Sequence, residues 1–170
     1  NFDNLSKDFS SIIERAKKNN ITAILSINTN PEKFERHYQL IKKYQSLFIS
    51  YGLHPGNVNS FNVPTVANLK FYCEYEYVIG IGETGLDFYR STEYTSEQYQ
   101  SFENHIESSY ETNLPLIIHQ RNSEKEIIEV LNNYQKSKPL KVVFHCFTGS
   151  NKLRSFCLDN EFYISLSGII

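Results

Sequence analysis

The chain has 170 residues, of which 40% are hydrophobic and 21% charged, so we expect one globular domain over residues 1–170 with a single core. Its formal net charge of −2 excludes a strong overall attraction to nucleic acid, so a polyanion would need a local basic patch or bound metal. No stretch approaches the roughly 18 apolar residues that cross a bilayer, and no signal peptide is evident. We therefore expect a cytoplasmic protein, or a nuclear one in a eukaryote, with no membrane association and no obligate protein partner.

Strand and helix patterns alternate along the chain. Short apolar runs rich in β-branched residues predict strands, and apolar residues at helical spacing predict amphipathic helices between them. The strands are expected at residues 21–27, 47–52, 77–82, 116–119, 140–147 and from 162 onward. The helices are expected at residues 4–18, after 31, and at 64–74, 95–111, after 123 and at 151–158. The uncharged run at 77–82 predicts a strand that is buried on both faces and ends at Glu83.

Three signals mark helix starts. They are Asn30 before Pro31, and two capping boxes, Thr95 with Gln98 and Ser123 with Glu126. Glu83 and its neighbour Asp87 could also cap the helix that follows their strand, and only the other strands can decide between capping and chemistry.

The regular alternation of strand and helix predicts parallel strands joined by right-handed crossovers. An open doubly wound sheet and a (β/α)8 barrel both fit this pattern. No G-x-G-x-x-G follows the first strand, so the nucleotide-binding open sheet loses support. A full barrel needs about 250 residues. The chain is therefore predicted to be an α/β protein of the (β/α)8 TIM-barrel type with about six βα units, strands 2 to 7 of the barrel. The chain contains no methionine, which suggests a piece of a longer protein.

Histidine or glutamate follows four consecutive predicted strands. These residues are His54, Glu83, His119 and His145. A single histidine at a strand end is more often structural than a ligand, but the last three residues recur one βα repeat apart, at the edge where barrel strands converge. Imidazole nitrogen and carboxylate oxygen suit Zn²⁺, Mn²⁺ or Mg²⁺, and a glutamate can bridge two cations that together activate water. The sequence therefore predicts a divalent metal site.

The same regions carry a family resemblance. The motifs are GLHPG at 52–56, GIGETGLDFYR at 80–90, LPLIIHQR at 114–121, FHCFTGS at 144–150 and FYISLSG at 162–168. In this order they resemble the TatD family of metal-dependent deoxyribonucleases, within the amidohydrolase-like barrels. The resemblance implies a (β/α)8 barrel with two divalent cations, Mg²⁺ first and Mn²⁺ or Zn²⁺ as alternatives, and exonuclease activity on a DNA substrate.

Matching motif by motif, the resemblance assigns the metal-bridging, catalytic carboxylate to Glu83 and the ligands of one metal to His119 and His145. Two family features are absent, the His-x-His pair of the first strand and the aspartate of the last. We expect both to lie outside this chain, which would then hold only part of the site. Gln120 also stands where the family more often has a small residue.

Four further residues are candidates for substrate binding or ligand orientation. His54 could contact the scissile phosphate, or it could stabilise its turn. The Arg121 fork suits phosphate, although an ion pair with Glu124 competes. Tyr89 could stack on a base, or it could simply pack against the protein. Asp87 could orient a ligand histidine, or it could cap a helix or loop.

The remaining histidines and the cysteines are assigned structural roles. His37 and His105 lie within predicted helices, so we expect them on solvated faces. Cys73, Cys146 and Cys157 have no CxxC spacing, so we expect reduced thiols that mostly fill the core. Cys146 should then point away from its neighbour His145, into the core.

The leading hypothesis is a TatD-type hydrolase that cleaves phosphodiester bonds of DNA with metal-activated water. One alternative is a metal-dependent ester or amide hydrolase of the same superfamily. The other is a truncated, inactive barrel that only binds metal or nucleic acid.

Overall fold

The computed structural model describes residues 8–89, 91–136 and 138–168. Within these residues, six strands form one parallel sheet in the order of the sequence. The strands are β1 (Ile24–Ser26), β2 (Leu47–Tyr51), β3 (Val78–Asp87), β4 (Leu116–Arg121), β5 (Val142–Phe144) and β6 (Tyr163–Ile164). The predicted parallel order and βα alternation are confirmed.

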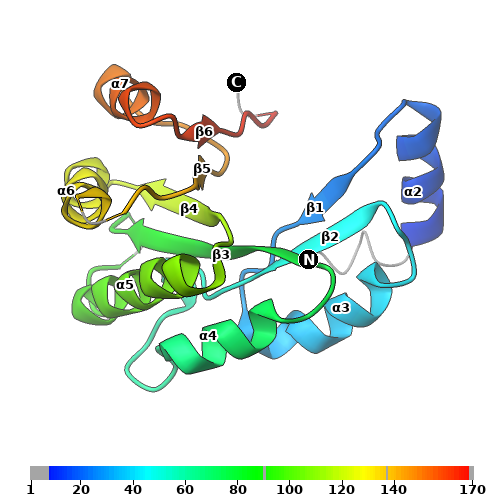
Figure 1. Ribbon diagram of the computed structural model, residues 1–170, viewed down its shortest axis with the longest axis horizontal. Coiled ribbons are helices and arrows are strands. Elements are labelled where there is room, and N and C mark those ends of the chain that lie inside the picture. The colour runs from blue at the N-terminus through cyan, green and yellow to red at the C-terminus, as the bar shows by residue number, and fades with distance from the viewer. Residues whose placement is uncertain (1–7, 90, 137, 169–170) are drawn as a thin grey trace.

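A helix precedes the first strand, a helix connects each pair of consecutive strands, and the helices cover the outer side of the curled sheet (Figure 1). They are α2 (Phe9–Lys18), α3 (Phe34–Ile41), α4 (Val66–Cys73), α5 (Thr95–Thr112), α6 (Glu124–Gln135) and α7 (Asn151–Asp159), with 3-10 turns η1 (Pro31–Lys33) and η2 (Pro55–Asn57). The sheet curls into a half-barrel, as six units of a TIM-type barrel should. The start of the predicted first helix, residues 4–7, lies outside the described residues.

The core lies between the sheet and the helices, in two clusters. One packs residues of β3 to β6 against α5, α6 and α7 around Phe102, Ile118 and Leu131. The other packs β2 and the start of β3 against α2, α3 and α4 around Phe34 and Tyr51. Because helices cover only one side, the prediction that β3 is buried on both faces is wrong at its start. Ile79 there is 38% exposed.

The predicted helix starts are correct in part. Asn30 caps η1 by accepting the Glu32 N–H, with proline in the first turn as expected. Ser123 is the N-cap residue of α6, but its hydroxyl donates to the Leu86 carbonyl instead of capping the helix. The capping box at Thr95 is wrong because α5 begins at that residue and the Gln98 side chain bonds to β3.

The three cysteines are free, as expected, and Cys157 is buried in the core. None of the helices in the described part of the chain combines the length and hydropathy that a membrane crossing needs.

Candidate metal centre

The candidate site lies where β3 and β4 extend beyond their neighbours. Both strands run further than predicted, past Glu83 to Asp87 and past His119 to Arg121. The two strands pair with each other up to Asp87 and Arg121, and this ladder keeps both extended. On its other side, β3 pairs with β2 only as far as Ile81. Glu83 is therefore an internal residue of β3 rather than its tip, and it lies beyond the end of β2.

A β-bulge sets the direction of the Glu83 side chain. Gly82 pairs with Ile117 and Thr84 with Ile118, so the ladder skips Glu83. A bulge of this kind re-aims a side chain, and bulges are frequent beside active sites. Gly82 has φ +134°, joins Glu83 through a cis peptide bond, and leaves no room for a Cβ against the Ile117 carbonyl. The Glu83 N–H is taken up by the Asn28 carbonyl at 2.9 Å.

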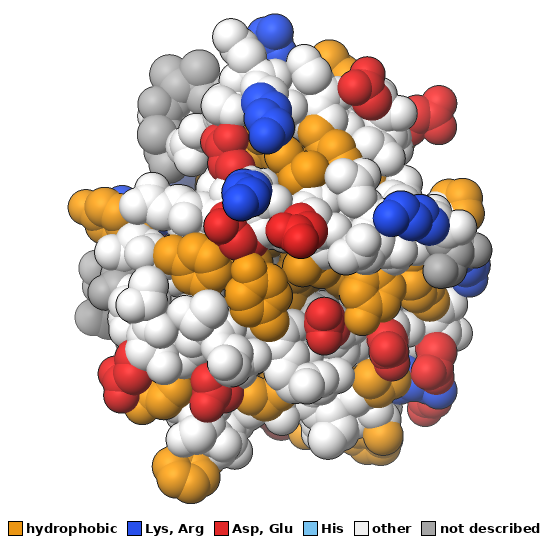
Figure 2. All heavy atoms as spheres, turned by 90° about the vertical axis from the view of Figure 1, so that its left-hand side faces the viewer, with side chains coloured by type: hydrophobic (Ala, Val, Ile, Leu, Met, Phe, Trp, Pro, Cys, Tyr) orange, Lys and Arg blue, Asp and Glu red, His pale blue; other side chains and the backbone are white. Residues whose placement is uncertain are grey.

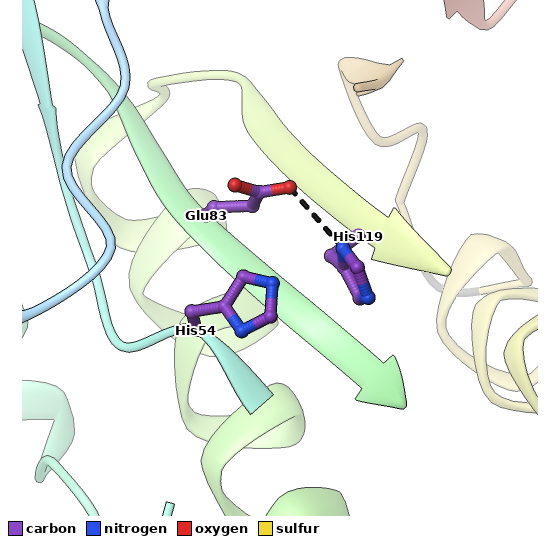
Figure 3. Close-up of side chains that lie close together, drawn as sticks. All are labelled: His54, Glu83 and His119. Atoms are coloured by element: carbon purple, nitrogen blue, oxygen red, sulfur yellow. Dashed lines mark ion pairs between the residues drawn. The ribbon is translucent and has the colours of Figure 1, made fainter. Parts of the chain in front are cut away.

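Four predicted side chains converge at this position. His145 Nδ1 lies 3.0 Å from Glu83 Oε1, and His119 Nδ1 lies 3.4 Å from the same oxygen. The rings of His54 and His119 have centroids 4.2 Å apart. One possible ligand atom from each of His54, Glu83 and His119 lies within 4.8 Å of the others, and Figure 3 shows these three side chains facing one common space.

The site favours an ionised carboxylate. Burial by itself would raise the pKa of Glu83, which is 6% exposed, but hydrogen bonds from His119 and His145 and the charge of His54 lower the pKa to about 2. The hydrogen bond to Glu83 raises the pKa of His145 against the opposing effect of burial. Imidazoles keep this buried carboxylate ionised, and a divalent cation at the same place would stabilise its negative charge as well. These residues therefore fit such an ion.

Asp87 contacts one of the histidines directly. Its Oδ2 lies 3.0 Å from His119 Nε2, and its Oδ1 accepts the Tyr89 N–H at 3.0 Å. The alternative that Glu83 and Asp87 cap the next helix is wrong, because α5 begins only at Thr95 with Tyr94 as its N-cap residue. The contact with His119 is the kind that orients a metal-binding histidine.

His54 is held by main-chain groups. Its Nδ1 accepts the Gly56 N–H at 2.9 Å, which stabilises the turn at Pro55. Its own N–H donates to the Thr29 carbonyl at 3.1 Å. His54 therefore combines a contact that stabilises its turn with a place beside His119.

Arg121 and Tyr89 stack on each other at the rim of the site. The guanidinium carbon lies 3.7 Å from the centre of the Tyr89 ring. The predicted ion pair of Arg121 with Glu124 is absent from the described part of the chain, because Glu124 instead accepts hydrogen bonds from the N–H and hydroxyl of Ser150. Arg121 and Tyr89 line a surface hollow of about 600 Å³, together with Gln120, Asn122, Ser123, Glu124, Lys125, Glu126 and Thr148.

Figure 2 looks onto the end of the sheet at which β3 and β4 terminate. Hydrophobic side chains gather across the middle of this face, and charged side chains surround them.

Two structural assignments made from the sequence are wrong. Cys146 is half-buried with φ +47°, and its Sγ lies 3.4 Å from His145 Nε2. It lies beside the site because β5 ends at Phe144, so strand alternation no longer applies. His105 is fully buried rather than solvated. Burial lowers its pKa to about 4. His37 is partly buried.

Sequence reasoning also missed polar residues around the site. Gln98 and His105 lie on the same face of α5 as Phe102 and Ile106, and that apolar spacing is the signal that could have revealed their burial. Asn28 is buried as well, and its side-chain amide has no hydrogen-bond partner among the described residues. No sequence pattern indicated the contact between its carbonyl and Glu83.

The whole chain, residues 1–170, matches the model of a protein family described as TatD related DNase. The chain belongs to this family. A Buchnera aphidicola protein described as an uncharacterized metal-dependent hydrolase is 34% identical over 170 residues, covering 100% of this chain and 63% of that protein. A Salmonella typhimurium protein named 3'-5' ssDNA/RNA exonuclease TatD is 26% identical over 162 residues, covering 95% of this chain and 62% of that protein.

The fold is also shared with a solved structure. A TatD homologue from Escherichia coli has a TM-score of 0.82 at 24% identity, covering 96% of this chain and 63% of that chain. This likeness confirms the TIM-barrel type of the TatD-related chain. The chain spans about 63% of the length of the curated relatives it matches.

Proposed function

We propose that the protein is a metal-dependent hydrolase that cleaves phosphodiester bonds of DNA, acting as an exonuclease. The observation that carries the proposal is the buried Glu83 carboxylate, ionised and faced by His54, His119 and His145. Membership in the TatD-related DNase family and a relative named as an exonuclease support the choice of reaction.

The proposed roles follow from the positions of the side chains. Glu83 presents one oxygen to both His119 and His145, so these three residues would hold a cation together. Glu83 is also the proposed catalytic carboxylate, and its second oxygen would be available to a second cation. Two divalent cations, Mg²⁺ first and Mn²⁺ or Zn²⁺ as alternatives, would supply activated water and charge for the phosphoryl oxygens. Asp87 would hold His119 in the orientation that points Nδ1 toward Glu83.

Substrate binding is proposed at the rim. Arg121 has its flat face covered by Tyr89, which leaves its hydrogen-bonding edge to meet a phosphate. The exposed ring of Tyr89 can stack on a base, because every base offers a π-face. His54, beside His119, is proposed to contact the scissile phosphate.

The proposal is tested by assaying cleavage of single-stranded DNA with Mg²⁺ or Mn²⁺, with a chelator, and with the Glu83→Gln variant. The chelator removes the cations, and the substitution removes the negative charge that would bind them. We therefore expect DNA cleavage to fall by at least about 100-fold in either case. Glu107→Gln is the matched control. It makes the same change at an exposed position on α5, and we expect it to keep the activity.

Double-stranded DNA, RNA, an aryl ester and a dipeptide complete the substrate panel. Hydrolysis of the ester or dipeptide alone would favour the alternative amide or ester hydrolase. Metal binding without turnover of any substrate would favour the inactive barrel. DNA cleavage that survives both the chelator and Glu83→Gln would overturn the mechanism.

A further inference from the structure

The long helix α5 carries two buried polar side chains that the proposed reaction does not use. Gln98 is 4% exposed and His105 is 0% exposed, and they lie two helical turns apart on the same face. Polar groups buried at this depth cost free energy unless they are hydrogen-bonded. Both side chains bond to main-chain groups directly beside candidate site residues.

Gln98 fixes the end of β3. The Asp87 N–H donates to Gln98 Oε1 at 2.9 Å, and Gln98 Nε2 donates to the Asp87 carbonyl at 3.3 Å. Since β2 stops pairing at Ile81, this part of β3 lacks a strand on one side. The amide of Gln98 offers one donor and one acceptor, and so replaces the missing strand at Asp87.

The contact passes from Asp87 to His119. Asp87 is 2% exposed, and its Oδ2 accepts from His119 Nε2 at 3.0 Å. With a hydrogen on Nε2, assigned from this hydrogen bond, Nδ1 is the ring atom that would bind a cation. That atom lies 3.4 Å from Glu83 Oε1, inside the candidate site. Gln98 therefore helps to hold the ligand atom of His119 in place without touching it.

His105 holds the segment just after β2 in a similar way. Its Nδ1 donates to the Ser101 carbonyl at 2.6 Å, so its Nε2 is the acceptor for the Leu53 N–H at 3.2 Å. Leu53 is buried and directly precedes His54. The N–H of His54 itself donates to the Thr29 carbonyl at 3.1 Å. The main chain is thus held on both sides of the peptide that leads into His54.

We propose that Gln98 and His105 are positioning residues that together form an α5 clamp, which sets the spacing between His54 and His119. The rings of these two histidines have centroids 4.2 Å apart, and each is reached from α5 through one intervening residue. The helix can keep this spacing because Phe102, between the two contact points, and Ile106, next to the second one, are fully buried. The inference rests on the proposed metal centre and adds which residues of α5 hold its histidines in position.

Metal affinity tests the clamp without an activity assay. Titration calorimetry of the protein with Mn²⁺ should show about fivefold weaker binding for Gln98→Leu, less than the roughly 10–100-fold typical of a direct partner of a ligand. Gln100→Leu makes the same change at an exposed position on α5 and should bind like the wild type. Ile106→Val controls for lost core stability, since it removes one buried methylene without removing a hydrogen bond.

An affinity for Gln98→Leu equal to that of both control variants would overturn the clamp. If Gln98→Leu does not fold, Gln98→Glu takes its place. It is nearly isosteric and keeps the acceptor for the Asp87 N–H, but it loses the donor to the Asp87 carbonyl. Weaker Mn²⁺ binding by Gln98→Glu supports the clamp, and unchanged binding contradicts it.

The hydrogen bond from His119 Nε2 to Asp87 gives an independent readout. Nitrogen-15 imidazole spectra of the metal-free protein should show a hydrogen-bonded Nε2–H at His119 in the wild type and in Gln100→Leu. Loss of the α5 contact should broaden and shift this Nε2–H signal, because Asp87 is then held less firmly. An Nε2–H signal that does not change in either Gln98 variant would refute the clamp. If the wild type fails to bind Mn²⁺, the proposed function fails, while these spectra still decide the positioning role.

Discussion

The two halves of β3 are held in different ways. Residues 78–81 pair with β2, whereas residues 81–87 pair with β4, so the strand changes partner at Ile81. Beyond this point the side that β2 has left is bonded by the Asn28 carbonyl at Glu83 and by the Gln98 amide at Asp87. The apolar half is thus bonded to β2, and the half that carries the chemistry is bonded to β4 on one side and to a loop and a helix on the other.

The largest expected effect comes from breaking the second half at Gly82. Gly82→Ala should lower the free energy of unfolding by about 3–5 kcal/mol, because φ +134° is strained for alanine and the new Cβ meets the Ile117 carbonyl. Gly80→Ala, in the first half, should cost only about 1 kcal/mol, because its Cβ meets the flexible end of the Ile117 side chain. Urea unfolding measures both, and equal costs would contradict the difference between the halves.

The next effect is a pH dependence from His105. Its pKa is about 4 in the folded chain and 6.5 when unperturbed, so below pH 6.5 the unfolded state binds a proton that the folded state does not. Each pKa unit is worth about 1.4 kcal/mol, so about 3 kcal/mol of stability present above pH 6.5 is lost as the pH falls to 4.

Unfolding measured from pH 7 to 4 checks this loss. His105→Gln offers a neutral acceptor in place of the imidazole, and it should be less stable than the wild type at pH 7. As the pH falls from 7 to 4, the free energy of unfolding of His105→Gln should then decline much less than that of the wild type. Parallel pH profiles for the two proteins would show that His105 is not the titrating group.

Asp87→Asn tests the second half of β3, residues 81–87, at the candidate metal centre itself. The amide can still accept the Tyr89 N–H, but it loses the charge that orients His119. We expect Mn²⁺ affinity to fall by about tenfold, the lower end of the range for a direct partner of a ligand. Calorimetry measures the affinity, with Asp159→Asn at the end of α7 as control. An unchanged Mn²⁺ affinity would show that Asp87 does not orient a metal ligand.

The smallest expected effect concerns the rim of the site, where Arg121 at the end of β4 stacks on Tyr89 beyond the end of β3. Arg121→Lys keeps the charge but loses the planar fork and the stack on Tyr89, which is worth about 0.5–1 kcal/mol at an exposed position. KM for single-stranded DNA should rise by about two- to fivefold, with kcat unchanged. Arg154→Lys, exposed on α7, is the control. A fall in kcat without a change in KM would speak against substrate binding by Arg121.

The order of the elements could be predicted from the sequence, because apolar runs and helical spacing reflect burial that each segment needs locally. The lengths of β3 and β4 could not. Their ends depend on the ladder between Gly85 and His119 and beyond, which is a property of two segments 34 residues apart (119 − 85). Before that ladder is known, Glu83 looks like a strand end rather than a bulged residue within the strand.

The candidate site could be predicted as a set of residues but not as a set of contacts. Glu83, His119 and His145 follow from their registered spacing and His54 from its place after a predicted strand, and the structure brings the four side chains together. Gln98 was misplaced because an amide three residues after a threonine can either cap a helix or bond elsewhere. Only the packing of α5 against β3 decides between these outcomes.

The loop after β1 reaches the site through its main chain. The Asn28 carbonyl accepts from Glu83 and the Thr29 carbonyl accepts from His54, so neither link depends on which side chains occupy positions 28 and 29. Substitutions in this loop can therefore accumulate while the two links persist. A change in loop length, by insertion or deletion of a single residue, would shift both carbonyls at once and disturb Glu83 and His54 together.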